Sequence, residues 1–285
     1  MKYIFKPARG YVFTKHVVEK LEKGELKVSL DLGRSLINIE IREGSVVLPS
    51  GLEVDLVFLR KIVKREDRAY FMEEGKRDIF EISISTPERY YKLMVVAPYT
   101  APTLEISGIH MHRIKSVTPL EDTLEKVKLA RIKKGCRVLD ICTGLGYTAI
   151  YSLKKGASSV VTVEKDLNVL EIARYNPWSR ELADDRIEVI LADASEYIHE
   201  LPSESFDRII HDPPRFALAG ELYSLAFYRE LCRVLRSGGI LFHYTGYPGA
   251  KRGLKFQAGV AARLRRAGFL QVKIVKDFAV IARKV

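Results

Sequence analysis

Four carboxylates at the ends of short apolar runs are the residues in this sequence best placed to do chemistry. They are Asp140 in Arg137–Ile141, Glu164 after Val160–Val163, Asp193 after Ile187–Leu191, and Asp212 after Phe206–Ile210. A carboxylate accepts hydrogen bonds from hydroxyl and amino groups. If the runs are parallel strands, their carboxyl ends lie at one edge of a sheet, which is where open α/β sheets bind ligands. The spacing therefore predicts one ligand site to which all four contribute.

The first of these runs continues into a glycine-containing loop, Cys142–Gly146, and then into a helix that begins at Tyr147. Glycine allows the backbone to approach a ligand where a Cβ atom would clash, and a helix N-terminus offers free N–H groups. Strand, loop and helix in this order form the first βα turn of a nucleotide-binding unit. In such a unit Glu164 would accept both ribose hydroxyls and Asp193 the amino group of adenine. This turn alone is also compatible with NAD.

The four motifs in this order resemble the class I S-adenosylmethionine (SAM)-dependent methyltransferases. The acidic–x–Gly–x–Gly–x–Gly pattern of that family is present here with Cys142 in place of one glycine. The spacing of all four motifs favours this family over NAD-binding proteins. The resemblance implies SAM as the cofactor. The residues expected to hold it are Asp140, Cys142, Thr143, Gly144, Gly146, Tyr147, Glu164, Lys165, Asp193, Ala194 and Asp212.

The segment His211–Asp212–Pro213–Pro214–Arg215–Phe216 resembles the Asp/Asn–Pro–Pro–aromatic motif of methyltransferases that act on exocyclic amines of bases. An exocyclic amine is a poor nucleophile because its lone pair is delocalised into the ring. The side chain of Asp212 and the carbonyl of Pro213 would accept its two hydrogens and turn the lone pair toward the methyl donor. We therefore assign catalytic roles to Asp212, Pro213, Pro214 and Phe216. The alternative is a rigid proline loop without chemistry.

The substrate is expected to contact His211, Arg215, Tyr244, Lys251 and Arg252. Arg215 replaces the aromatic residue of the family motif and could stack on a base or hold a phosphate, while Phe216 could take over the stacking. The loop with Lys251 and Arg252 is basic and could clamp RNA, although an exposed arginine face on a helix explains it equally well. For His211 and Tyr244 the alternative is an ordinary polar residue at a strand end.

The elements that would position this site alternate between strand and helix from residue 116 to residue 285. A helix is predicted to begin at Thr118 with a capping box to Glu121, and to bury Leu120, Leu124, Val127 and Ala130. The later segments predict a Rossmann-like, doubly wound α/β sheet of seven strands. Residues 1–115 contain short β-branched runs separated by turn residues, and we expect a small β-rich (α+β) N-terminal domain there.

Composition limits the class of partner. The formal net charge is +11, which favours a polyanion such as RNA, although abundant Lys, Arg and Glu with few Asn and Gln also fit a thermophile.

Residues 61–77 are basic with Tyr70 and Phe71 interleaved, which suggests an RNA-docking surface or a solvated face. His110 and His112 lack a recognisable third ligand, so we expect no metal. The three cysteines indicate no disulfide framework, and no run is long enough for a membrane span. The protein is expected in the cytoplasm.

The chain also resembles a group of archaeal methyltransferases with the same His–Asp–Pro–Pro–Arg–Phe signature. These observations predict an RNA methyltransferase acting on a base amino group, with ribosomal RNA preferred over tRNA and cytosine N4 over adenine N6 and guanine N2. One rival is an aminopropyltransferase of the spermidine-synthase type that uses decarboxylated SAM. The high positive charge argues against its cationic substrate. The second rival is an RNA-binding factor without catalysis.

Overall fold

The computed structural model describes residues 1–246 and 250–285, with the side chains of 250–254 outside the description. The chain forms two compact units. We call Met1–Ile4, Thr123–Leu167 and Leu182–Val285 the C-terminal unit, and Phe5–Asp122 with Asn168–Glu181 the N-terminal unit. No helix among the described residues is long and apolar enough to cross a membrane.

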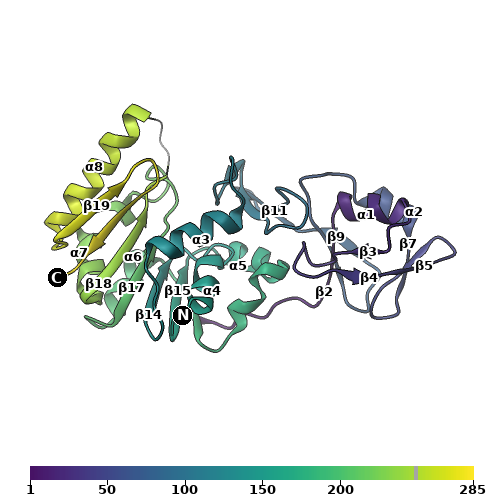
Figure 1. Cartoon of the computed structure of the whole chain (residues 1–285), viewed down its shortest axis with the longest axis horizontal. Coiled ribbons are helices and arrows are strands. Elements are labelled where there is room, and N and C mark those ends of the chain that lie inside the picture. The colour runs from purple at the N-terminus through teal and green to yellow at the C-terminus, as the bar shows by residue number, and fades with distance from the viewer. Residues whose placement is uncertain (247–249) are drawn as a thin grey trace. The chain divides into compact units, whose positions relative to one another are not determined.

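The C-terminal unit contains one large sheet with helices on both faces (Figure 1). Its elements are β1 (Lys2–Tyr3), β14 (Arg137–Ile141), α4 (Tyr147–Lys154), β15 (Ser159–Glu164), β16 (Ile187–Leu191), α6 (Ala194–Tyr197), η2 (Ile198–Glu200), β17 (Phe206–His211), η3 (Gly220–Tyr223), α7 (Leu225–Val234), β18 (Leu235–Tyr244), α8 (Ala250–Arg266), β19 (Gln271–Val275) and β20 (Ala279–Arg283). Three further elements contribute residues to both units: α3 (Pro119–Leu129), α5 (Leu167–Arg174) and η1 (Pro177–Ala183).

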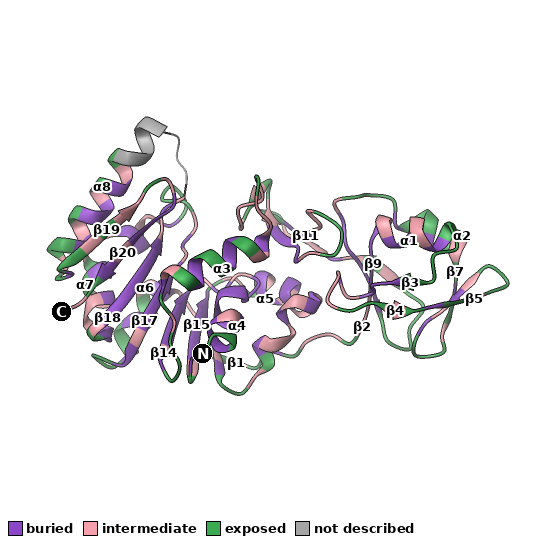
Figure 2. Ribbon diagram, viewed as in Figure 1, coloured by how far each residue is buried: buried purple, intermediate pink, exposed green. Residues whose placement is uncertain are grey.

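The strand order in this sheet is β1-β16-β15-β14-β17-β18-β20-β19. Strands β14 to β18 pair in parallel, whereas β1, β19 and β20 pair antiparallel to their neighbours. The central strands are buried along most of their length (Figure 2), as expected when helices cover both faces. The predicted Rossmann-like class is confirmed, and β1 adds a strand to the seven that the sequence indicated. The order brings the ends of β16, β15, β14 and β17 next to one another.

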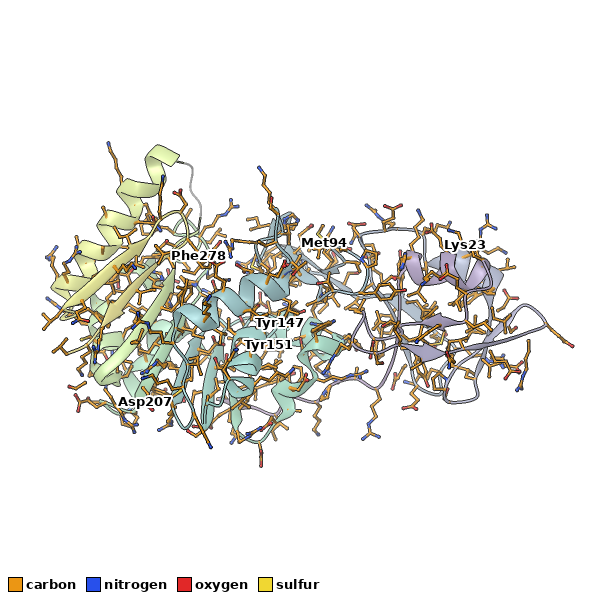
Figure 3. All side chains as sticks on the ribbon, viewed as in Figure 1. Lys23, Met94, Tyr147, Tyr151, Asp207 and Phe278 are labelled. Carbon is orange, nitrogen blue, oxygen red and sulfur yellow. The ribbon has the colours of Figure 1, made fainter. Side chains whose placement is uncertain are left out.

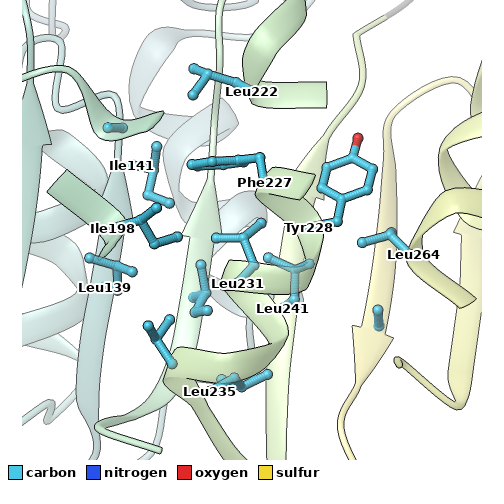
Figure 4. Close-up of a cluster of buried hydrophobic side chains, with 14 of the residues drawn as sticks. Leu139, Ile141, Ile198, Leu222, Phe227, Tyr228, Leu231, Leu235, Leu241 and Leu264 are labelled. Atoms are coloured by element: carbon cyan, nitrogen blue, oxygen red, sulfur yellow. The ribbon is translucent and has the colours of Figure 1, made fainter. Parts of the chain in front are cut away.

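Apolar packing on the two faces of the sheet fixes the helices that frame the site. On one face Leu139, Ile141 and Leu241 pack with Leu231 of α7 and Leu264 of α8 (Figure 4). On the opposite face Val127 and Ala130 of α3 pack with Ile210 and Phe242. Because successive strand residues point to opposite faces, the side chains of Asp140 and Leu139 lie on different faces of β14. Asp140 is therefore on the face that α3 covers.

The N-terminal unit is built from four small antiparallel sheets and two short helices. Its elements are β2 (Gly10–Phe13), α1 (Lys15–Glu22), β3 (Lys27–Val28), β4 (Ile37–Asn38), β5 (Glu40–Arg42), β6 (Ser45–Val47), β7 (Glu53–Asp55), α2 (Leu56–Ile62), β8 (Tyr70–Glu73), β9 (Ile79–Glu81), β10 (Ser83–Ser85), β11 (Tyr90–Met94), β12 (Thr103–Ile106) and β13 (Ile109–His110). Residues 168–181 belong to it because Tyr175 packs edge-on against Phe71 and Phe80, and the Trp178 ring N–H donates to the carbonyl of Leu32. The two units are therefore not separated by one domain boundary at residue 115, because residues 168–181 also belong to the N-terminal unit.

Two local predictions were wrong. One of the short β-branched runs in residues 1–115, Val54–Phe58, is not a strand throughout, because β7 ends at Asp55 and α2 begins at Leu56, where the Asp55 carboxylate accepts a hydrogen bond from the Phe58 N–H at 2.6 Å. In α3 the predicted capping box is present, with Thr118 and Glu121 bonded reciprocally. Val127 and Ala130 are buried as predicted, but the buried face also carries the polar residues Asp122, Thr123 and Lys126, whereas Leu124 is exposed. Hydrophobic periodicity could not indicate this face, because these polar groups are buried through specific pairing.

Candidate functional site

The glycine loop between β14 and α4 adopts a backbone that most side chains disfavour. Cys142, Gly144 and Gly146 have φ values of 71°, 54° and 78°. A Cβ on Gly146 would lie 2.5 Å from side-chain atoms of buried Leu182, so packing requires glycine there. A Cβ on Gly144 would meet no atom of the described residues within 4 Å. The backbone at Gly144 therefore borders open space that a cofactor could fill.

The start of α4 offers backbone donors to that space. Gly146 is the N-cap and supplies no side-chain acceptor to the first turn of the helix. A helix N-terminus favours anionic or electron-rich ligand atoms. The ring of Tyr147 is buried, and Tyr151 follows one turn later on the same helix face (Figure 3). Tyr147, which we expected to contact the cofactor, can do so through its backbone N–H more readily than through its ring.

Glu164, at the end of β15, binds the glycine loop directly. Its Oε2 accepts the Gly144 N–H at 3.0 Å, and its Oε1 accepts the N–H groups of Lys165 and Asp166 at 3.0 Å. Burial raises the pKa of this carboxyl, while the backbone donors counteract the rise. A carboxylate has about four acceptor positions, and three backbone donors fill three of them, so Glu164 retains capacity for one further donor such as a ribose hydroxyl.

Asp193, after β16, is the N-cap of α6 and accepts hydrogen bonds from the Ser195 N–H and hydroxyl at 2.9 and 2.7 Å. Partial burial opposes its ionisation, but the Ser195 hydrogen bonds and the Lys165 charge lower its pKa below the ordinary value. The Lys165 ammonium lies 3.7 Å from Asp193 and 3.8 Å from Glu221. Lys165 and Asp193 are thus adjacent, and buried Ala194 follows in the chain.

Asp140 is fully buried and is bonded inside the protein. Its Oδ2 accepts the Thr162 hydroxyl at 2.7 Å, and the Thr162 oxygen lies 2.6 Å from that of Thr143. Because Thr162 uses its proton toward Asp140, Thr143 donates to Thr162. Burial raises the pKa of Asp140 to about 7. Asp140 and Thr143 therefore stabilise the glycine loop from within the protein. This corrects our expectation that Asp140 itself faces the cofactor.

Asp212 follows β17, and its N–H donates to the Ile141 carbonyl at 3.2 Å, which places it beside the glycine loop. Its Oδ2 accepts a hydrogen bond from the Lys126 ammonium of α3 at 2.7 Å. That ammonium also lies 4.4 Å from the ring centroid of Tyr244 in β18. The side chains of Asp212 and Tyr244 thus both contact Lys126. We had not identified Lys126 from the sequence, because a lysine inside a helix normally indicates an exposed face.

The Asp–Pro–Pro loop is held by an aromatic group. The Tyr223 hydroxyl donates to the Pro214 carbonyl at 2.8 Å, and its ring contacts Phe216 and Phe256 at centroid distances of 5.5 and 5.7 Å. Pro213 is buried, whereas the Phe216 side chain is 53% exposed and can accept a stacking partner. Arg215 is also exposed. This arrangement is compatible with base stacking on Phe216 and phosphate contact by Arg215.

One other substrate prediction, that for His211, changes, and the predictions for Lys251 and Arg252 fall outside the described residues. His211 is fully buried, its Nε2 lies 3.0 Å from the Leu222 carbonyl, and its ring packs on His243 at 4.4 Å. Burial lowers its pKa to about 3, so it is a neutral core residue. We therefore no longer expect His211 to touch substrate. The side chains of Lys251 and Arg252 lie outside the described residues.

The basic stretch in the N-terminal unit lacks the expected exposed aromatics. Tyr70 and Phe71 are buried in the core, and Arg68 is buried and bonded to Glu81 at 2.6 Å. Stacking of RNA bases on Tyr70 or Phe71 is therefore wrong, although neighbouring Lys61 and other lysines remain exposed. His110 and His112 are bonded separately, to Glu105 and Thr103. The described residues contain no group of three potential metal ligands.

The N-terminal unit also contains an open cavity of about 410 Å³. Its lining includes Thr14, His16, Asp67, Pro98 and Tyr99. None of our predicted cofactor or substrate residues lines it. No motif in the sequence pointed to this cavity, because its walls come from separate turns of the unit.

Comparison with known families shows a match to a methyltransferase domain over residues 138–239. The uncharacterized protein MJ1233 of Methanocaldococcus jannaschii is 46% identical over 275 residues, which are 94% of this chain and 93% of that protein. The ribosomal RNA large subunit methyltransferase I of Aeromonas hydrophila is 32% identical over 124 residues. That match covers 41% of this chain but 31% of the relative, so the likeness concerns one part of that enzyme.

Among solved structures, a spermidine synthase in complex with the transition state analogue AdoDATO aligns with a TM-score of 0.58. The alignment covers 74% of this chain and 78% of the synthase, at 20% sequence identity. At that identity the likeness concerns the fold.

Proposed function

Because this chain belongs to the class I SAM-dependent methyltransferases, in one family with the Methanocaldococcus protein, we propose that it methylates an exocyclic amino group of an RNA base. SAM is its cofactor and, when bound, supplies the electrophilic methyl group. The observation that carries the proposal is the position of Asp212–Pro213–Pro214, bonded to the end of β14 beside the glycine loop. Ribosomal RNA is the preferred substrate class over tRNA, and cytosine N4 the preferred atom.

The cofactor contacts follow from the donors and acceptors at the strand ends. Glu164 would accept a ribose hydroxyl at its remaining acceptor position, and Asp193 would accept from the adenine amino group. Gly144 leaves space for the cofactor, and the N-terminus of α4 contributes backbone N–H groups. Cys142, at positive φ beside three carboxylates, would border the methionine part, and burial keeps its pKa well above the ordinary thiol value. This thiol is therefore neutral and does not compete as a nucleophile.

The reacting amine would be oriented by the Asp–Pro–Pro loop. Asp212 and the Pro213 carbonyl would accept its two hydrogens, and Phe216 would stack on the base. Orientation of the nitrogen for in-line attack can supply roughly 7–11 kcal/mol of the barrier reduction. A base in a duplex would have to be turned out of the helix to reach Asp212. Arg215 would hold a neighbouring phosphate.

The spermidine-synthase fold likeness keeps aminopropyl transfer as a second candidate. The charges around Asp212 favour methyl transfer to a base amine over aminopropyl transfer. The buried Lys126 ammonium is bonded to Asp212, so the carboxylate that would have to attract a cationic polyamine is already neutralised. A base amine is uncharged and does not meet this repulsion. The preference can be tested by titration calorimetry with SAM and with decarboxylated SAM.

The decisive experiment combines the purified protein, methyl-labelled SAM and total RNA from a strain in which the gene is deleted. The RNA is digested to nucleosides, and the labelled species is identified by mass. Label in an N-methylated base that disappears with Asp212→Ala supports the proposal, provided that the variant still binds SAM. Label in a ribose or ring carbon would overturn the amine chemistry. RNA binding without any transfer would favour a non-catalytic RNA-binding factor.

A further inference from the structure

Lys126 is a buried cation in direct contact with the proposed catalytic carboxylate. Its side chain is 1% exposed, and its Nζ lies 2.7 Å from Asp212 Oδ2, at the carboxyl end of β17. Burying an ammonium is costly unless it is paired and hydrogen-bonded. The lysine lies on the face of α3 that packs on the sheet with Val127 and Ala130, where an apolar residue would fill the space at lower cost. Packing alone therefore does not explain a lysine at position 126.

Asp212 shares its surroundings with the carboxyl group of Asp140 and with the neutral groups of Cys142 and Tyr223. Among the described residues, the charged and titratable groups around Asp212 are Lys126 of α3, Asp140 of β14, Cys142 of the glycine loop and Tyr223 of η3, and the Tyr244 ring of β18 lies beside the Lys126 ammonium. Burial is the main cause of the raised pKa of Asp140 and of Cys142; the Asp212 charge adds to both shifts, and the Lys126 charge opposes the shift of Asp140. Like charges that share a site favour protonation of one of them. Among the described residues, Lys126 is the cation that contacts Asp212 and opposes this effect.

We propose that Lys126 is a positioning residue that holds Asp212 ionised and fixes the orientation of its carboxylate toward the substrate amine. The inference rests on the proposed function, because it concerns how Asp212 meets an amino group. A protonated Asp212 would present an O–H donor to the N–H donors of the substrate, and the hydrogen bonds needed for orientation would be lost. The ammonium binds Oδ2 from the α3 side and so restrains the side-chain rotamer as well.

The test compares Lys126→Met, which removes both charge and hydrogen bond, with Lys126→Gln, which removes the charge but retains an N–H donor on a side chain one bond shorter. Lys128→Met is the matched control, because Lys128 lies on the same helix but is exposed. We expect Lys126→Met to lower kcat at pH 7 at least 100-fold, while Kd for SAM and KM for RNA change less than threefold. In Lys126→Met the acidic limb of the pH–rate profile should move to higher pH by about 1–3 pH units. Lys126→Gln should show the same shift with a smaller loss of kcat at high pH.

A double-mutant cycle with Asp212→Asn separates this role from a purely structural one. If Lys126 acts through the charge of Asp212, adding Lys126→Met to Asp212→Asn should lower kcat less than twofold further. Losses that multiply, or an unshifted pH profile in both Lys126 variants, would overturn the proposal. If Lys126→Met does not fold, Lys126→Gln carries the same comparison.

A second readout does not depend on the RNA substrate. The carboxyl carbon of Asp212 can be titrated by NMR in protein with labelled aspartate, using Asp212→Asn to assign the signal. The midpoint should rise by at least about one pH unit in Lys126→Gln relative to wild type and remain unchanged in Lys128→Met. If wild type methylates no RNA but the midpoint rises, the proposed function fails while the electrostatic role of Lys126 stands. An unchanged midpoint would refute that role.

Discussion

At the scale of single residues, burial decides which polar groups support the site and which can face a ligand. Asp140 and His211 both come from strands that end at the site, yet both are fully enclosed. Burial disfavours the charged form of each, so the pKa of the acid rises and that of the histidine falls. These opposite shifts give opposite dependences of stability on pH, which single substitutions can separate.

We expect Asp140→Asn to become increasingly stabilising, relative to wild type, as the pH rises. In the unfolded chain Asp140 ionises near its ordinary pKa, but in the folded protein it does so at about 7. The contribution of Asp140 to the free energy of unfolding is therefore intact below about pH 4. As the pH rises through 7, the wild type loses roughly 2–4 kcal/mol of this stability. Thermal unfolding at pH 4, 6 and 8 measures this, with exposed Asp78→Asn as the control. A pH-independent difference in Tm would contradict the burial of an acid at this site.

His211→Gln should weaken the loss of stability in acid. Neutral His211 contributes stability above its unfolded pKa near 6.5, and this is lost as the pH falls toward its folded value of about 3. The glutamine can donate to the Leu222 carbonyl but cannot take up a proton. Between pH 7 and pH 5 the Tm of wild type should fall about 4–8 °C more than that of the variant, corresponding to about 2 kcal/mol. Exposed His199→Gln provides the comparison, and equal slopes for His211→Gln and wild type would argue against a buried neutral imidazole.

At the scale of elements, the strand β14, the glycine loop and the helix α4 act together. Parallel pairing of β14 with β15 and β17 brings Glu164 and Asp212 to the two sides of the loop. The loop itself needs positive φ at three positions, which two glycines provide without strain and Cys142 provides at a cost. The two glycines differ in what surrounds them, and this difference can be tested.

Gly144→Ala and Gly146→Ala should separate cofactor binding from folding. Both introduce a Cβ at positive φ, which costs about 1–2 kcal/mol. At Gly146 the methyl also overlaps Leu182, so the unfolding free energy should fall by about 2–5 kcal/mol in total. At Gly144 the methyl enters the space expected for SAM, so SAM affinity should fall at least tenfold with modest loss of stability. Chemical denaturation and calorimetry give both quantities, and normal SAM binding by Gly144→Ala would contradict this cofactor placement.

At the scale of the whole molecule, the net charge of +11 is the feature that relates most directly to a partner. Many basic side chains are paired with acids, among them Arg42 with Glu40 and Arg68 with Glu81. A surface that serves stability alone would bind RNA weakly. A surface that binds the phosphate backbone releases counterions, so its affinity falls steeply with salt.

We expect RNA binding to show a slope of about −2 or steeper in a plot of log K against log salt, which corresponds to about three or more phosphates on single-stranded RNA. Arg215→Ala should reduce the magnitude of this slope by about 0.7, the value for one lost phosphate contact. Arg42→Ala is the control, because Arg42 is paired with Glu40 in a hairpin of the N-terminal unit. Fluorescence anisotropy over a salt series measures the slope. Binding that does not depend on salt would contradict an RNA substrate.

The sequence by itself determined the βα order, the glycine turn and the four strand-end acids, because strand periodicity and turn residues are local properties. Tertiary structure decided which of these groups are enclosed. Lys126 meets Asp212 across 86 residues of sequence, and no local pattern reports such a pairing. In the same way, the burial of Tyr70 and Phe71 depends on the residues that pack on them, and Tyr175, which is distant in sequence, packs on Phe71. Burial of polar and aromatic side chains depends on long-range partners, and therefore only the folded chain distinguishes residues that support the site from residues available to a ligand.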